Sequence, residues 1–142
     1  MAYEKKWMGG LDVLRDSATG AILVADGVNA PPGAVAKFAK IDANSDAAAG
    51  NEIVAAVVGK KIRVVSMRLA QGEAGANVAT WYSGPADTGT ALDGGNEMSL
   101  APGYVERGKY GELLLETVAG ESLVLLLTAA LQVRGRLTYF EV

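Results

Sequence analysis

Acidic side chains are the residues of this sequence best suited to catalysis, because the chain contains neither histidine nor cysteine. Without histidine there is no Ser-His-Asp triad, and without cysteine there is no thiolate nucleophile or disulfide. Paired carboxylates remain, as in a glycosidase. The candidates are Asp87, Asp93, Glu97, Glu106, Glu112 and Glu116. None has a distinctive sequence context, so we expect no catalytic residues and a protein that is not an enzyme.

Two short segments resemble parts of ligand-binding loops. The segment Asp42–Asp46 begins like a calcium-binding EF-hand loop, but the required glycine is Ala47 and the required glutamate is Ile53. Gly59–Lys61 resembles the end of a phosphate-binding loop, but the required upstream glycine is Val54. We therefore expect a polar turn at residues 42–46, no metal ion and no cofactor.

Aromatic and basic residues supply the candidate binding surfaces. Trp81 and Tyr82 are adjacent in a predicted strand, so one ring points inward and the other outward, where a partner can reach it. Trp7 lies in a stretch with little strand pattern, where a large ring either docks on a neighbouring subunit or packs on its own domain. The candidate interface residues are Tyr3, Lys5, Lys6, Trp7, Trp81, Tyr82 and Tyr104.

Short apolar runs separated by glycine-containing turns are the elements that must position these residues. This rhythm predicts an all-β protein, a jelly-roll-like antiparallel β-sandwich. The predicted strands are 21–25, 35–41, 52–58, 61–70, 77–83, 97–100, 112–118, 122–128 and 134–142. At most one short helical turn is expected, near residues 42–49. We assign residues 21–142 to a single β-sandwich domain and residues 1–20 to an extended N-terminal arm.

Two of these segments carry more detailed predictions. From Lys61 to Leu69 the charged and apolar residues alternate, as in a half-buried strand. The alternation changes phase near Ser66, which predicts a β-bulge or a strand end there. The segment Val118–Glu121 is typical of a tight hairpin turn between two apolar strands.

Composition indicates which partners the protein can have. The formal net charge is -3, and the thirteen basic residues are scattered, so we expect no nucleic-acid partner. The densest basic groups are Lys5-Lys6, Lys60–Arg63 and Arg134–Arg136, and each is expected to solvate a strand end. The longest apolar stretch, residues 123–133, is shorter than the ~20 residues that span a bilayer, so we expect no membrane partner.

Three segments together resemble a known family. They are Glu52–Val64, with the pattern V-x-G-K-K-I-R-V, Glu116–Leu123 and Val133–Tyr139. As a set they resemble the capsid-decorating cement proteins of tailed bacteriophages, over roughly residues 52–142. The resemblance implies a jelly roll and no catalytic residues. It does not map partner-binding positions onto this chain.

The resemblance also implies a function. Such a protein decorates the outer capsid surface of the virion and cements adjacent major capsid subunits against the pressure of packaged DNA. Its partners are then the phage major capsid protein and itself, with a homodimer expected first and a trimer second. The alternative is a phage fibre or receptor-binding β-sandwich that recognises host glycans. That alternative predicts a trimer and an exposed aromatic platform at Trp81 or Tyr104. A carboxylate-based glycosidase or lyase is the remaining alternative.

Overall fold

The protein is built from β-strands joined by turns and loops. A computed structural model describes residues 3–8, 11–16, 22–23, 34–98, 104–107 and 114–142. Every regular element in these ranges is a strand, and no helix occurs among them, including at residues 42–49. The all-β prediction is therefore confirmed.

The N-terminal residues form a small sheet. Strand β1 (Tyr3–Met8) pairs antiparallel with β2 (Leu11–Asp16), and β2 pairs with β3 (Ile22–Leu23). The sequence showed little strand pattern over residues 1–20, so β1 and β2 were not expected. The strand predicted at 21–25 is present as β3, but it pairs with β2 and not with the sandwich. The assignment of residues 1–20 to an arm stays a prediction.

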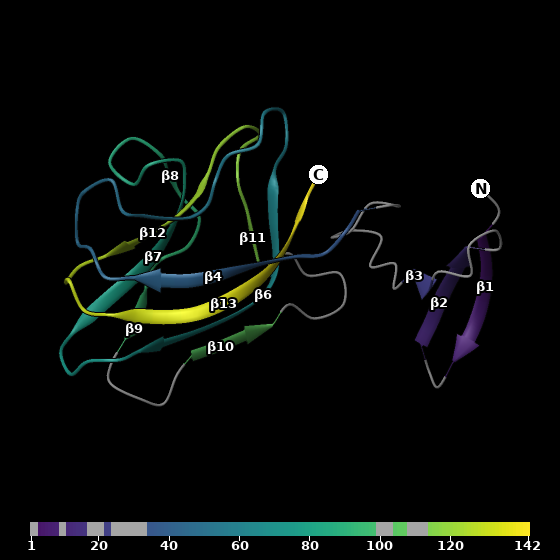
Figure 1. Cartoon of the computed structure of the whole chain (residues 1–142), viewed down its shortest axis with the longest axis horizontal. Coiled ribbons are helices and arrows are strands. Elements are labelled where there is room, and N and C mark those ends of the chain that lie inside the picture. Colours follow the sequence, from purple (N-terminus) through teal and green to yellow (C-terminus); the bar gives the residue numbers. More distant parts are fainter. Residues whose placement is uncertain (1–2, 9–10, 17–21, 24–33, 99–103, 108–113) are drawn as a thin grey trace.

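Two antiparallel sheets packed face to face form the sandwich (Figure 1). Sheet 1 contains β10 (Tyr104–Arg107), β6 (Ile62–Gln71), β13 (Val133–Glu141) and β4 (Lys37–Ala43), in that order, and β11 (Leu115–Glu116) also pairs with β6. Sheet 2 contains β5 (Asn51–Val54), β12 (Leu123–Leu127), β7 (Asn77–Ser83) and β8 (Thr90–Ala91), and β9 (Asn96–Met98) also pairs with β7.

The strand order is that of a jelly roll. The first sandwich strand, β4, pairs with the last, β13, and the second, β5, pairs with the penultimate, β12. The third, β6, then pairs with β13, and the fourth, β7, pairs with β12. The chain is thus a long series of paired strands folded into two sheets, as in the double-sheet β-sandwiches of this class.

Alternating apolar residues of both sheets fill the space between them. In β7 the side chains of Asn77, Ala79, Trp81 and Ser83 are buried, whereas the residues between them are only partly buried. Trp81 is fully buried, with 0% of its surface exposed. The other large side chains with almost no exposure are Ile41, Ile62, Leu69, Leu123, Leu125, Leu127, Leu137, Val64 and Val133. This alternation fixes which residues of each strand face outward.

A bulge sets the outward face of β6. The pairing with β13 shifts register between Thr138 and Tyr139, because Thr138 lies opposite Ser66 and Tyr139 lies opposite Val64. Val65 is therefore the extra residue, and the predicted bulge near Ser66 is confirmed. Beyond it, Met67 and Leu69 point into the core.

The turn at Val118–Glu121 differs from the hairpin that the sequence predicts. The turn is tight, with Glu121 N donating to Val118 O at 3.2 Å and Gly120 at φ 81°. However, β11 lies in sheet 1 and β12 lies in sheet 2, so the turn crosses between the sheets. Two apolar strands that follow one another need not pair when each has a nearer partner from elsewhere in the chain.

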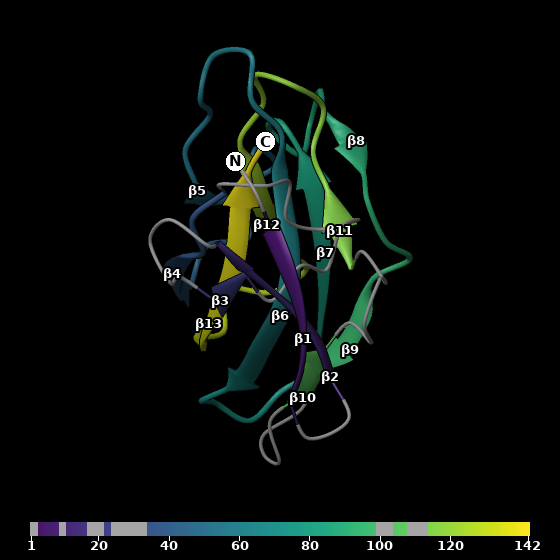
Figure 2. The same ribbon diagram turned by 90° about the vertical axis from the view of Figure 1, so that its right-hand side faces the viewer.

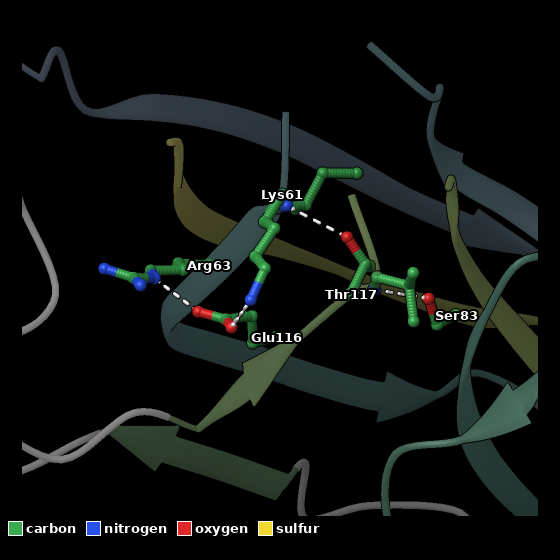
Figure 3. Close-up of polar contacts among 7 residues, drawn as sticks. Lys61, Arg63, Ser83, Glu116 and Thr117 are labelled. Atoms are coloured by element: carbon green, nitrogen blue, oxygen red, sulfur yellow. Dashed lines mark hydrogen bonds and ion pairs between the residues drawn. The ribbon is translucent and has the colours of Figure 1, made fainter. Parts of the chain in front are cut away.

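Polar side chains fasten this crossing (Figure 3). Lys61 Nζ lies 2.8 Å from Glu116 Oε1, and Arg63 Nε donates to Glu116 Oε2. Ile62 N donates to Thr117 Oγ1 at 2.9 Å, which joins β6 to the end of β11. Val118 N donates to Ser83 Oγ at 2.8 Å, which joins the same segment to sheet 2. The hydroxyl groups of Thr117 and Ser83 thus tie the crossing segment to both sheets.

Glu116 makes the stability of this crossing depend on pH. Burial raises the pKa of its carboxyl, but the hydrogen bonds from Lys61 and Arg63 together outweigh it, so the pKa lies below the usual value of 4.5. A carboxyl whose pKa is lowered by folding stabilises the folded protein at pH values above its usual pKa. This stabilisation is lost as the pH falls through the lower pKa of the folded state. We expect E116Q to cost about 1 kcal/mol of unfolding free energy at neutral pH, measured by urea denaturation.

Repeating the titration at about pH 3 tests the assignment. The difference between E116Q and the wild-type protein should shrink there, because the wild-type carboxylate is then partly protonated. E52Q is the matched control, since Glu52 is exposed and outside the ion pairs described for this chain. A difference for E116Q that is unchanged between neutral pH and pH 3 contradicts the assignment.

Candidate functional site

Cationic side chains gather on the outward face of sheet 1. In β6, Arg68 lies between the buried Met67 and Leu69, so its side chain points away from the core. In β13, Arg134 and Arg136 alternate with the buried Val133 and Leu137 and also point outward. The pairing of β6 with β13 therefore brings three arginines to one face of the sheet.

These residues line an open hollow of about 410 Å³. Its lining consists of Arg68, Ala70, Arg134, Gly135 and Arg136, and we call it the cationic hollow. Ala70 has a small side chain and Gly135 has none, so the surface between the longer arginine side chains is recessed. A hollow of this size is within the range of ligand-binding clefts.

Like charges lie directly opposite one another at this site. Arg136 is the cross-strand partner of Arg68 on one side and of Lys40 on the other. Like charges in such positions destabilise a sheet by about 0.2–1 kcal/mol. Within the described part of the chain, the side chains of the three arginines of the hollow donate no hydrogen bond and form no ion pair. No described residue of the chain therefore occupies their guanidinium groups.

One carboxylate lies beside the hollow. Asp42 is the cross-strand partner of Arg134 and pairs with Lys40. The hydrogen bond from Lys40, more than the charge of Arg134, holds the pKa of the Asp42 carboxyl below its usual value. Asp42 also accepts a hydrogen bond from Gln132 Nε2 at 2.7 Å. Lys40 and Gln132 bind this carboxylate directly, whereas Arg134 acts on it only through its charge.

A second exposed surface lies at one end of the sandwich. Val58 is 97% exposed, Val118 is 53% exposed and Val57 is 37% exposed. Their two loops touch, because Gly120 N donates to Lys60 O at 2.8 Å. Figures 1 and 2 show these loops together at the end of the sandwich where the chain terminates. We call residues 55–58 and 118–119 the apolar tip.

The aromatic candidates are distributed between core and surface. Trp81 is a core residue, so it cannot serve as a surface platform, and this corrects its place among the interface candidates. Tyr82 points the other way and is partly exposed, as the alternation predicted. Tyr3, Lys5, Lys6 and Trp7 lie in β1, and Tyr104 lies in β10; their side chains lie outside the described residues.

The candidate carboxylates that the structure describes lie in different local settings. Asp93 Oδ1 accepts hydrogen bonds from Trp81 N and Gly95 N, both at 3.1 Å, which is the role of a turn-forming side chain. Glu116 is held by the two cations of the sheet crossing. Asp87 and Glu97 are exposed on the loops and short strands around β8 and β9. Glu112 and the side chain of Glu106 lie outside the described residues.

The two motif fragments have structural roles. Asn51 Oδ1 accepts a hydrogen bond from Ser45 N at 3.2 Å, and Ser45 Oγ accepts one from Ala47 N at 3.2 Å. Residues 42–43 end strand β4 and the turn lies a few residues later than the sequence predicts, at residues 47–50, where Gly50 N donates to Ala47 O at 2.8 Å. Gly59 has φ 71° in the turn where Lys60 N donates to Val57 O at 3.0 Å.

Sequence patterns missed both surfaces. The sequence predicts that the basic pair Arg134 and Arg136 solvates a strand end, and it gives no link between this pair and Arg68. The strand predicted at 52–58 ends at Val54 in the structure, which leaves Val57 and Val58 in a loop. The sequence does contain a signal for the apolar tip, because Gly59 and two lysines directly follow the apolar run and indicate that the strand ends before them.

Comparison with protein-family models, with curated proteins and with solved structures found no match to this chain in any of the three. In the described part of the chain, no helix has the length and hydropathy to cross a membrane. The chemistry of the two surfaces and the sequence resemblance therefore carry the functional argument.

Proposed function

We propose that this protein is a capsid-decorating cement protein of a tailed bacteriophage. The observation that carries the proposal is that one sandwich has two exposed surfaces of different chemistry, the apolar tip and the cationic hollow. A protein that bridges adjacent subunits needs two contacts on one body. Two linked contacts raise the effective affinity by about 10²–10⁴ even when each is modest.

The two surfaces are well separated along the same strand. Ile62 begins β6 next to the apolar tip, and Arg68 lies six residues further along this strand. At ~3.3 Å per residue this is about 20 Å, so the two contacts can meet different subunits. The paired central strands β6 and β13 connect the two surfaces through a backbone ladder with one bulge at Val65, and such a pairing suits a protein that must carry mechanical load.

The outer surface of the virion is the proposed location, and the major capsid protein is the proposed partner. A homodimer is the first expectation for self-association and a trimer the second. Among the described strands, β4 and β5 are edge strands of the two sheets, and their outer backbone groups could take part in such a contact. The glycan-binding alternative loses the aromatic platform that it predicted at Trp81, since that ring is in the core.

Co-sedimentation with undecorated mature capsids tests this proposal. We expect saturable binding near one copy per shell subunit and a higher thermal rupture temperature of the decorated capsids. V58D should weaken the binding by roughly tenfold or more, because it places a charge in an apolar contact. Val58 is almost fully exposed, so the variant should fold normally.

A48D is the matched control, because Ala48 is exposed on a loop outside both surfaces. It adds the same charge and should bind capsids like the wild-type protein. Light scattering on the unbound protein separates a dimer from a trimer. A wild-type protein that binds no capsid form contradicts the proposal, and a stable trimer in that case would favour a fibre component.

A further inference from the structure

We infer that the cationic hollow is a docking site for an extended acidic segment of a partner polypeptide. The inference rests on the proposed function only for the identity of the partner, which would be the capsid protein. The recognition of carboxylates rests on the three arginines and their arrangement. The recognised group would be a series of Asp or Glu carboxylates, which guanidinium groups bind in a bidentate manner.

The spacing of the arginines matches an extended peptide. Arg134 and Arg136 are two residues apart on one face of β13, so their backbone positions are about 7 Å apart. Arg68 lies directly across from Arg136, about 5 Å away. Alternate side chains of an extended peptide also repeat at about 7 Å. Carboxylates at alternate positions can therefore meet Arg134 and Arg136, and Arg68 can share the second carboxylate.

The position of the arginines argues against a purely structural role. Arg68 and Arg136 repel one another across the strand pair, and none of the hollow's arginines forms an ion pair within the described residues. A residue that only solvates a strand needs no such juxtaposition. Local arrangements that oppose folding are expected at functional sites. The repulsion disappears when a carboxylate lies between the guanidinium groups.

The charge of the whole chain favours a polypeptide over a nucleic acid. The net charge is -3, so the protein outside the hollow repels a long phosphate backbone. Single-stranded nucleic acid would also need aromatic rings on which bases stack. The residues that line the hollow are arginine, alanine and glycine. A short acidic segment needs only the local positive field, which the hollow supplies.

A fluorescent octapeptide with glutamate at alternate positions and threonine between them is the probe. We expect saturable binding, measured by fluorescence anisotropy, that weakens with added salt. R136Q and R68Q should each weaken it by roughly tenfold, since each removes one charge-assisted contact. R136K should lie between R136Q and the wild-type protein, because lysine keeps the charge without the planar fork.

K37Q is the matched control, because it lowers the net charge by the same amount and Lys37 pairs with Glu141 outside the hollow. It should bind the peptide like the wild-type protein. R136Q should also keep an unchanged or higher melting temperature, which separates lost binding from lost folding. The inference is overturned if the peptide does not bind, if R136Q and K37Q behave alike, or if an oligothymidylate or a heparin fragment of similar charge binds more tightly.

Capsid binding separates this inference from the proposed function. If V58D loses capsid binding but R68Q and R136Q retain it, the hollow is not the docking site although the cement role stands. If the peptide binds as expected but no variant or wild-type protein binds capsids, the hollow recognises acidic segments of a different partner. In that case the cement role is the part that fails.

Discussion

W81A is expected to lower the free energy of unfolding by about 3–5 kcal/mol, the largest effect of any single substitution that we propose. Trp81 is fully buried between the sheets, and its backbone pairs with Leu125 of β12. Removing the ring leaves a cavity that neighbouring strands cannot fill without breaking their ladders. Urea denaturation followed by circular dichroism measures the loss, which should appear as a lower midpoint with an unchanged slope.

W81F separates the apolar ring from the indole N–H. Trp81 Nε1 is buried and has no hydrogen-bond partner among the described residues. Phenylalanine leaves a smaller cavity and removes this unsatisfied donor, whose burial costs about 1–3 kcal/mol. We therefore expect W81F to stay within about 1 kcal/mol of the wild-type protein. A loss for W81A below about 1.5 kcal/mol would show that Trp81 is not a principal part of the core.

G135A is expected to have the second largest effect, a loss of about 3 kcal/mol or more. Gly135 lies in β13 between β6 and β4, opposite Leu69 and Ile41. A Cβ at this position would lie 1.8 Å from Arg68 O and 2.8 Å from Arg68 C. Both contacts are with backbone, so relief requires the two central strands of sheet 1 to move apart.

G94A is the matched control for this substitution. A Cβ on Gly94 would meet no atom within 4 Å, so this variant should lie within about 0.5 kcal/mol of the wild-type protein. Any loss of peptide binding by G135A should follow the loss of folded protein, because the hollow exists only where β6 and β13 pair. Equal stabilities for G135A and G94A would contradict the close approach of β13 to β6.

The scaffold and the two surfaces have different physical requirements. Trp81 in the core and Gly135 between two central strands hold the sheets and strands in register, and substitutions there reduce stability. Surface residues such as Val58 and Arg136 contact little of their own chain, and substitutions there should change binding alone. The two sets of variants therefore test the fold and the proposed function independently.

The sequence by itself determined the class of the fold and several of its details. Alternating apolar residues and frequent glycines predicted an antiparallel β-sandwich, and the strand at Asn77–Ser83 matches β7 at both ends. The change of phase near Ser66 predicted the bulge in β6, because side chains of a strand alternate strictly between its two faces. These features are local, so a short window of residues is enough to specify them.

Only the tertiary structure decided which distant residues meet. Arg68 reaches Arg136 because β6 and β13 pair in one register, and a shift by one residue would send either arginine to the opposite face. The apolar run after Glu52 leaves the sheet at Val54, because the chain crosses there from sheet 2 to sheet 1. Strand pairing between residues so far apart in the sequence depends on the packing of the whole core, so no local pattern brings the three arginines of the cationic hollow together.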